Sequence, residues 1–294
     1  MLDVTRLRVL AAVARVGSVT AAAQELRYSQ PAVSHHLARL EHETGTRLIQ
    51  RVGRGIRLTK AGLLLAERAE EILGRLGAAE VELAAHSGLR AGRVRLAAFP
   101  SALATVVPHA AATFTAGHPG VELGFVEAEP PEALHMLRAG EVDVAVVFEY
   151  PDDTGRAEQG VRPTPLLTEP LYLVTPADRA TNLTDHVDDD WIGGCERCRS
   201  HLVRRCAAAG FTPRIAFTTD DYVAVQALVA AGLGVTILPE LTLTAHRVPG
   251  IRATRLAGAG REVSIARYGE PPDPSATTAL VEHLTSGRTP AAPG

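Results

Sequence analysis

Several features are scarce or missing in this sequence, and each absence disfavours a class of protein. No hydrophobic run approaches the ~18 consecutive apolar residues of a membrane-spanning helix, so we do not expect a membrane protein. The first residues lack the basic-then-apolar order of a secretion signal, which predicts a cytoplasmic protein. A nucleophile elbow, a phosphate-binding loop, an HExxH motif and a Rossmann glycine fingerprint are also missing. We therefore expect neither catalytic residues nor a cofactor, and no enzymatic activity.

Cysteine is rare as well, but the three cysteines of the chain lie close together. Cys195, Cys198, His201 and Cys206 follow the pattern Cys-x2-Cys-x2-His-x4-Cys, which resembles a zinc knuckle but is too short before the histidine. Most of the pattern falls on or beside an expected helix, so we predict no metal site. Small, semi-polar thiols suit the wall of a pocket, and this interpretation is favoured. Thiol redox sensing by the Cys-x2-Cys pair remains an open alternative.

Basic residues are concentrated at the start of the chain, and Lys60 is the single lysine among them. Residues 1–60 hold ten basic and four acidic side chains, a net charge of +6, and because the whole chain carries −3 the remainder carries −9. An acidic chain with a basic head is typical of local affinity for nucleic acid. A small helical module can also carry a few extra arginines, so charge alone does not decide the function.

Residues 17–45 predict two short helices joined by a tight turn. Ser18 and Thr20 are suited to cap the first helix, and Ser29 is suited to cap the second, because a hydroxyl accepts from free amide groups there. Pro31 falls in the first turn of the second helix, where a missing N–H has no cost. Polar side chains at the front of this helix are what readout of the DNA major groove requires. Its apolar positions face a core and its polar positions face outward: Val33, Leu37 and Leu40 on the first side, and Gln30, Ser34, His35 and Arg39 on the other.

Two short apolar runs follow, on either side of the tip Gly53-Arg54-Gly55, and predict a β-hairpin. Together with the helices, this hairpin predicts a winged helix-turn-helix that binds double-stranded DNA. Arg51, Arg54 and Arg57 are placed to contact phosphate groups or a minor groove.

The runs AAAQELRYSQPAVSHHLARLE and GTRLIQRVGRGIRLTKAG resemble the DNA-binding segment of LysR-type transcriptional regulators. The resemblance implies that the SQPAVS segment opens the recognition helix. This sequence has His35 where the family more often has arginine. The DNA-contacting residues that we expect are Thr20, Ser29, Gln30, Pro31, Ser34, His35, Arg39, Arg51, Arg54 and Arg57.

A long helix is predicted after the hairpin, with a separate structural helix before it at residues 3–15. Six apolar residues alternate spacings of four and three and form a heptad seam, which favours pairing with a second helix. The alternative is an ordinary surface helix, and Gly74 and Gly77 weaken the helix by about 1 kcal/mol each. The family resemblance implies a dimerisation linker and a homodimer or a dimer of dimers. The seam residues are Leu65, Ala69, Ile72, Leu76, Ala79 and Leu83.

From residue 91 onward, strands and helices alternate, which predicts a parallel sheet covered by helices. We expect two α/β lobes joined by crossing strands, an architecture like that of periplasmic binding proteins. The predicted division is a DNA-binding domain at 1–58, a linker helix at 59–90 and an effector-binding domain at 91–294. Within the last, lobe 1 covers about 91–161 and 267–294, and lobe 2 about 162–266.

Ligands in such folds bind beyond the carboxyl ends of the strands. The junction Phe99-Pro100-Ser101-Ala102 changes from strand to helix, where free amide groups favour an anionic ligand. Ser101 is also explained by capping alone. The run AGLGVTILP at 231–239 makes this region similar to the effector-binding domain of LysR-type regulators, which implies an effector between the lobes. The expected lining residues are Pro100, Ser101, Ala102, Phe148, Glu149, Gly194, Cys195, Glu196, Thr218 and Asp220.

The function that these patterns favour is a DNA-binding transcriptional regulator controlled by a small, anionic effector. RNA polymerase is a further expected partner. The competing class is a solute-binding protein or an enzyme with an incidental helical head. An enzyme would need an organised nucleophile or acid–base pair, and the sequence offers neither.

Overall fold

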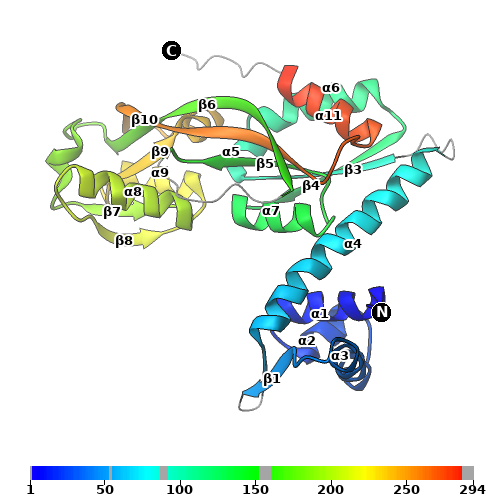
Figure 1. Cartoon of the computed structure of the whole chain (residues 1–294). Helices are drawn as coiled ribbons and strands as arrows, with labels where there is room; N and C mark the ends of the chain where they lie inside the picture. Colours follow the sequence, from blue (N-terminus) through cyan, green and yellow to red (C-terminus); the bar gives the residue numbers. More distant parts are fainter. Residues whose placement is uncertain (1, 53–54, 87–91, 152–159, 287–294) are drawn as a thin grey trace. The chain divides into compact units, whose positions relative to one another are not determined.

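The computed structural model describes residues 2–52, 55–86, 92–151 and 160–286 (Figure 1). The chain forms two compact units. One comprises residues 1–90 with 135–142, and the other comprises residues 91–134 with 143–294. In the described part of the chain, no helix is both long enough and apolar enough to cross a membrane.

The first unit begins with three helices whose ends follow from their capping residues. Helix α1 (Val4–Val16) starts where the Asp3 side chain accepts from the Arg6 amide, and α2 (Val19–Glu25) starts at the cap Ser18. Helix α3 (Gln30–Thr44) starts at the cap Ser29 and ends at Gly45, whose φ of 61° is the left-handed conformation that glycine adopts readily. The three helices share one core, formed by residues such as Leu7, Leu10, Ala22, Val33, Leu37 and Leu40.

The predicted hairpin is present as β1 (Ile49–Val52) and β2 (Gly55–Leu58), which pair antiparallel. The Glu41 carboxylate at the end of α3 holds its first strand by accepting from the amides of Leu48 (2.7 Å) and Ile49 (3.1 Å). The long helix α4 (Lys60–His86) follows directly and runs without a break through Gly62, Gly74 and Gly77.

The second unit is built around one mixed sheet with the strand order β4-β3-β5-β10-β6-β9. Strand β3 (Gly92–Ala98) pairs parallel with β4 (Val121–Glu127) and β5 (Val144–Glu149). Strands β6 (Val161–Pro176) and β10 (Ile251–Tyr268) are long and antiparallel to each other, and β9 (Thr236–Pro239) lies at the edge. The sheet is therefore mixed, whereas the alternation of elements predicted a parallel one.

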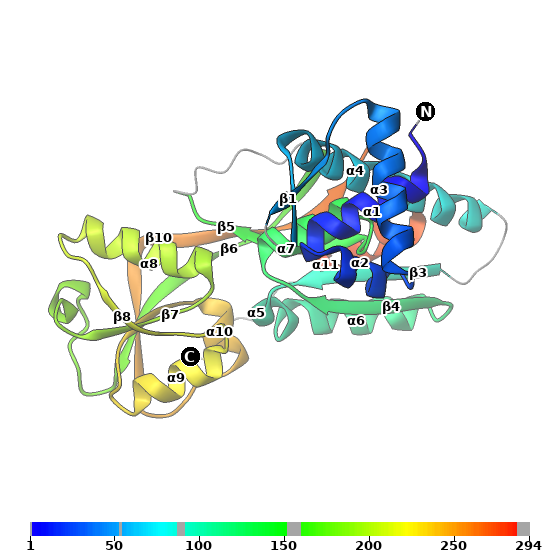
Figure 2. The ribbon, with the colours of Figure 1, turned by 90° about the horizontal axis from the view of Figure 1, so that it is seen from below.

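Strands β6 and β10 run side by side through both lobes and so join them (Figure 2). A smaller parallel pair, β7 (Asp190–Gly193) and β8 (Arg214–Thr218), belongs to the second lobe. The helices that cover these sheets are α5 (Pro100–Leu103), α6 (Val106–Gly117), α7 (Pro130–Arg138), α8 (Glu196–Ala208), α9 (Tyr222–Ala230), α10 (Glu240–Ala245) and α11 (Ser275–Ser286). A short 3-10 helix, η1, spans Leu183–His186.

Candidate DNA-binding surface and ligand cavity

The front of α3 projects into solvent, as the sequence predicts. Ser29 accepts a hydrogen bond from the Ala32 amide at 3.3 Å, and Pro31 occupies the first turn. Arg27, in the turn before it, has a φ of 56°, a conformation that few residues other than glycine adopt. This turn lets α3 leave α2 with its apolar side on the core. The exposed residues are Thr20, Ser29, Gln30, Pro31, Ser34, His35 and Arg39.

The hairpin adds basic residues to this surface. Arg57 is exposed on β2, opposite Gln50. The backbone of Arg51 lies in β1, and Arg54 lies outside the described residues. One feature of the surface was not expected: the exposed ring of Tyr28 stacks on His36 beside the start of α3, with ring centroids 5.7 Å apart.

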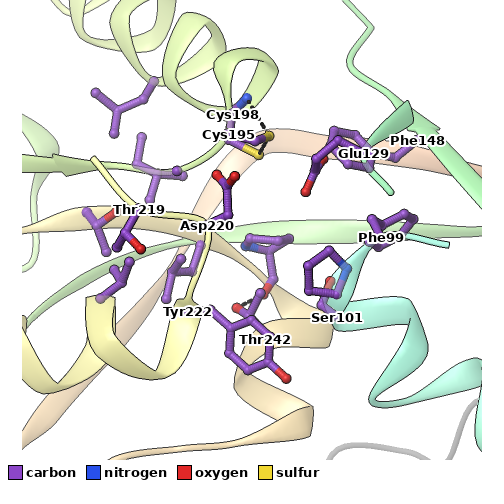
Figure 3. Close-up of a pocket in the computed structure, with 18 of the residues that line it drawn as sticks. Phe99, Ser101, Glu129, Phe148, Cys195, Cys198, Thr219, Asp220, Tyr222 and Thr242 are labelled. Atoms are coloured by element: carbon purple, nitrogen blue, oxygen red, sulfur yellow. Dashed lines mark hydrogen bonds between the residues drawn. The ribbon is translucent and has the colours of Figure 1, made fainter. Parts of the chain in front are cut away.

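A cavity of about 60 Å³ opens between the two lobes of the second unit (Figure 3). Phe99, Pro100 and Ser101 line it from the first lobe, and Gly194, Cys195 and Cys198 line it from the start of α8. The remaining lining residues are Glu129, Phe148, Leu202, Thr219, Asp220, Tyr222, Val225, Thr236, Ile237, Leu238, Pro239, Thr242 and Arg261. An adjoining opening of about 410 Å³ shares Glu129, Cys195 and Asp220 with the cavity.

Of the lining residues predicted from the sequence, Pro100, Ser101, Phe148, Gly194, Cys195 and Asp220 border the cavity, and Glu196 borders the adjoining opening. Three others do not border either space. Ala102 is fully buried, Glu149 is exposed at the end of β5, and Thr219 rather than Thr218 lines the cavity. The Thr219 amide donates to the Gly193 carbonyl at 3.0 Å, which fixes this residue at the cavity.

Sequence reasoning missed Glu129 and Arg261. Glu129 follows the carboxyl end of β4, so the rule used for the other junctions could have found it. Arg261 and its partner Glu169 face each other on β10 and β6 and form an ion pair with side chains that are 2 % and 1 % exposed. Nothing in the local sequence marks either residue as buried.

The Arg261 guanidinium is fully engaged by its surroundings. It contacts Glu169 Oε1, donates to Ser101 Oγ at 3.3 Å, and lies 4.7 Å and 4.0 Å from the ring centroids of Phe99 and Phe148. Glu169 Oε2 accepts from the Leu241 amide at 2.9 Å. Burial by itself would lower the pKa of Arg261, but the adjacent Glu169 carboxylate raises it above its ordinary value. Arg261 therefore stays charged, and its ion pair with Glu169 ties the two crossing strands to α5 and α10.

Two thiols lie together at the start of α8. Cys195 caps the helix, and its Sγ donates to Cys198 Sγ at 2.7 Å. This hydrogen bond raises the pKa of the Cys195 thiol and, together with Arg261, lowers the pKa of the Cys198 thiol. Cys206 lies apart from them in a core with Trp191, and burial raises its pKa to about 11. Among the described residues, no group of three or more His, Cys, Asp or Glu side chains could hold a metal ion.

An exposed helix-turn-helix with a basic wing, in one chain with a two-lobed ligand cavity, defines a class of protein: a DNA-binding regulator that responds to a small molecule. Comparison with known proteins identifies the family. Residues 4–63 match the family model "Bacterial regulatory helix-turn-helix protein, lysR family", and residues 87–288 match "LysR substrate binding domain". The chain belongs to the LysR family of DNA-binding transcriptional regulators and has the effector-binding domain of that family.

Similar proteins agree with this assignment. A probable HTH-type transcriptional regulator, LrrA, from Synechococcus elongatus is 30% identical over 272 residues, which are 88% of this chain and 90% of that protein. The HTH-type transcriptional regulator TfdS from Cupriavidus pinatubonensis is 29% identical over 90% of this chain and 91% of its own. The crystal structure of full-length CbnR with its target DNA is similar with a TM-score of 0.60 and 25% identity, over 98% of this chain and all of that one.

Proposed function

We propose that this regulator recognises its operator through the front of α3, which enters the major groove, while the wing contacts the DNA backbone. The observation that carries the proposal is the division of α3 into two sides. Val33, Leu37 and Leu40 are buried in the head, whereas the residues at the front of the helix are exposed. Those exposed residues, Ser29, Gln30, Pro31, Ser34 and His35, include donors and acceptors that base edges require.

We assign residues 1–58 to DNA binding, 59–90 to the linker helix and 91–294 to effector binding. Lobe 1 then covers about 91–161 and 267–294, and lobe 2 covers about 162–266. We further propose that α4 pairs with its counterpart in a homodimer, which can pair again into a tetramer. The exposed apolar side chains of Ile72 and Leu76 on α4 support this pairing. Two heads then bind a two-fold symmetric operator.

The effector acts by population shift in this proposal, because a ligand that prefers one arrangement of the lobes changes how the protomers pack. The chain acts without catalysis, as a regulator that contacts RNA polymerase in the cytoplasm, where the operator DNA lies. The regulators to which it is similar support this reading over the alternative of an enzyme or a solute-binding protein.

The test is fluorescence anisotropy of the full chain with labelled DNA from upstream of its own gene, measured over a range of salt. Arg57→Ala should weaken binding to all sequences alike and lower the slope of log affinity against log salt by about 1. Gln30→Ala should instead reduce discrimination between the operator and unrelated DNA. The ratio of the two affinities should fall by about tenfold or more, which corresponds to the free energy of one lost contact to a base. Arg93→Ala, an exposed arginine on β3, is the matched control. Affinity that neither depends on salt nor discriminates between sequences would contradict the proposal.

A further inference from the structure

Two carboxylates lie among the mostly apolar residues that line the cavity between the lobes. Glu129 and Asp220 line both the cavity and the adjoining opening, and Figure 3 shows their side chains pointing into the same space below the cysteine pair. Glu132 and Glu196 lie around the opening, and Glu127 and Asp221 line a neighbouring hollow. The arginines at these three spaces are Arg197, Arg204 and Arg261.

These arginines offset the carboxylates only in part. The charge of Arg261 is matched by Glu169 inside the protein, so it does not require an anionic ligand. Arg197 donates to the Phe148 carbonyl at 2.8 Å. Arg197 and Arg204 keep their positive charge, but the six carboxylates around the three spaces outnumber them, so the net charge there is negative.

The sequence predicts an anionic effector from free amide groups at the start of the helix after β3, and the structure does not support that argument. Helix α5 comprises only Pro100–Leu103, its first residue has no N–H, and the amides of Ala102 and Leu103 already donate to the Phe99 carbonyl. Acidic residues occupy the other helix starts nearby. Glu196 lies in the first turn of α8, and Asp221 caps α9 by accepting from the amides of Val223 and Ala224. These helix starts therefore offer an anion little attraction.

Glu129 points to a ligand independently of this charge excess. Its side chain is partly buried, and its Oε2 atom is fully buried without a hydrogen-bond partner among the described residues, while the Cys195 thiol is a hydrogen-bonding group beside the carboxylate. Burial raises the pKa of Glu129, and the nearby carboxylates of Asp220 and Glu127 raise it further, against the opposing effects of Cys195 and Arg261. A buried carboxylate oxygen without a donor is unfavourable, and a cationic donor in the cavity would correct this.

We propose that the effector is a small cation, an alkylammonium or guanidinium compound with a short apolar part, whose charged group binds between Glu129 and Asp220. This inference rests on the proposed function and names the class of molecule that its cavity binds. The apolar part lies against the side chains that close the rest of the cavity, which include Phe99, Phe148 and Val225.

The test compares probes that differ in charge but share a carbon skeleton: butylamine with butyrate and benzylamine with benzoate, with agmatine as the guanidinium probe. Thermal shift and calorimetry on the full chain should show binding of amines and none of the carboxylates. Amine affinity should rise from mildly acidic to neutral pH, because Glu129 loses its proton while the amines remain charged. Carboxylates that bind where amines fail would overturn the proposal, and so would binding of neither.

Variants locate the binding and separate the two proposals. Glu129→Gln and Asp220→Asn should each weaken amine binding by about tenfold or more, the equivalent of one charged hydrogen bond. Glu122→Gln, an exposed carboxylate on β4 away from the cavity, should leave it unchanged. An amine effect that survives Glu129→Gln counts against the site. Operator binding is measured in parallel: a chain that binds its operator but no amine contradicts this inference alone, whereas a chain that binds no operator contradicts the proposed function.

Discussion

Glu129 makes the stability of the protein depend on pH in an unusual direction. Most carboxylates in folded proteins are held in the charged form, but the pKa of Glu129 is raised above its ordinary value of 4.5, mainly by burial. At a pH between the ordinary and the raised pKa, the Glu129 carboxyl therefore holds a proton in the folded chain that it has lost in the unfolded chain. Stability from this group is present below the ordinary pKa and is lost as the pH rises through the raised one.

Glu129→Gln should remove this dependence. The free energy of unfolding of the variant minus that of the wild type, from urea denaturation without ligand, should increase as the pH rises through this window and then level off. Glu122→Gln should show a flat difference. A difference that decreases with rising pH would mean that Glu129 is instead stabilised as a carboxylate.

The thiols of Cys195 and Cys198 are placed to form a disulfide bond on oxidation. Cys195 Sγ and Cys198 Sγ lie 2.7 Å apart, and a disulfide bond is about 2.05 Å long, so the two sulfur atoms need to move little to form one. Cys206 lies near the other end of α8, where it is buried beside Trp191 and apart from these two thiols. Mild oxidation with diamide, which accepts two electrons and two protons from two thiols, should therefore consume this pair first.

Of the three free thiols, two should be lost and the Cys206 thiol should remain. The measurement is a thiol count in denaturant before and after oxidation, with peptide mass mapping of the bond. Cys195→Ser and Cys198→Ser should each prevent the bond, whereas Cys206→Ser should not. If the pair also senses peroxide, the first two variants abolish any peroxide-dependent change in DNA binding, and an unchanged response would exclude that role.

The sequence predicted the site residues at strand-to-helix junctions but not those that are buried by the pairing of distant strands. Residues at strand-to-helix junctions, such as Pro100, Ser101 and Cys195, were located from the pattern because topology places these junctions at one edge of a sheet. Arg261 and Glu169 were not, because their burial depends on pairing between strands that lie far apart in the sequence. This unseen pair leaves the carboxylates Glu129 and Asp220 to set the charge of the cavity, and the proposed charge of the effector changed with it.

At the scale of elements, local signals located the helices well and the long strands poorly. The caps Asp3, Ser18 and Ser29 and the stop at Gly45 lie where the sequence indicated, because capping is decided by neighbouring residues. The sequence predicts strands only at residues 171–174 and 261–268, which are parts of β6 and β10. Prolines within β6 and glycines within β10 are typical of loops, and the pairing of the two strands, with its register shifts, overrides that preference.

The sequence also predicts one continuous helix in this unit, over residues 101–115. The structure divides residues 101–115 into α5 and α6, with Thr105 between them at a φ of −129° and a ψ of −77°. The Thr105 hydroxyl accepts no capping bond and instead donates to the Ser101 carbonyl at 2.5 Å. Apolar periodicity continues through this break, so the pattern alone could not locate it.

Gly62 at the start of α4 lies where a larger residue does not fit. A Cβ atom on Gly62 would lie 2.0 Å from the Leu48 carbonyl oxygen, so the wing and the helix can approach this closely only because the residue is glycine. Gly62→Ala should destabilise the head by about 2 kcal/mol, a typical cost of overpacking. Gly77→Ala is the matched control in the same helix, because a Cβ there meets nothing within 4 Å.

The control should stabilise the protein by about 1 kcal/mol, since alanine favours a helix more than glycine does. Chemical denaturation of both variants, followed by circular dichroism, measures the two effects. Equal effects of the two substitutions would show that the wing does not require the close approach.

For the whole molecule, the proposed pairing of the long helix would set how many copies act together. The seam predicted from the sequence divides into two parts. Leu65 is partly buried and Ala69 fully buried against the three-helix head, whereas Ile72, Leu76 and Ala79 are exposed. The first part therefore stabilises the head, and the second part is available to a partner helix.

Leu76→Glu places a charge in the exposed part of this seam and should shift the protein from dimer to monomer. The dimer dissociation constant should rise by about tenfold or more, because the free energy of burying one leucine side chain at the interface is lost. Leu63→Glu, in which an equally apolar and more exposed leucine (57% against 40%) is changed on the opposite side of α4, should leave the dimer intact. Sedimentation velocity measures the assembly of both. A two-fold symmetric operator should bind the Leu76 variant more weakly than the Leu63 variant, while single half-sites should bind both alike, because only the pairing of heads is lost. Dimers that persist in Leu76→Glu would place the interface elsewhere in the chain.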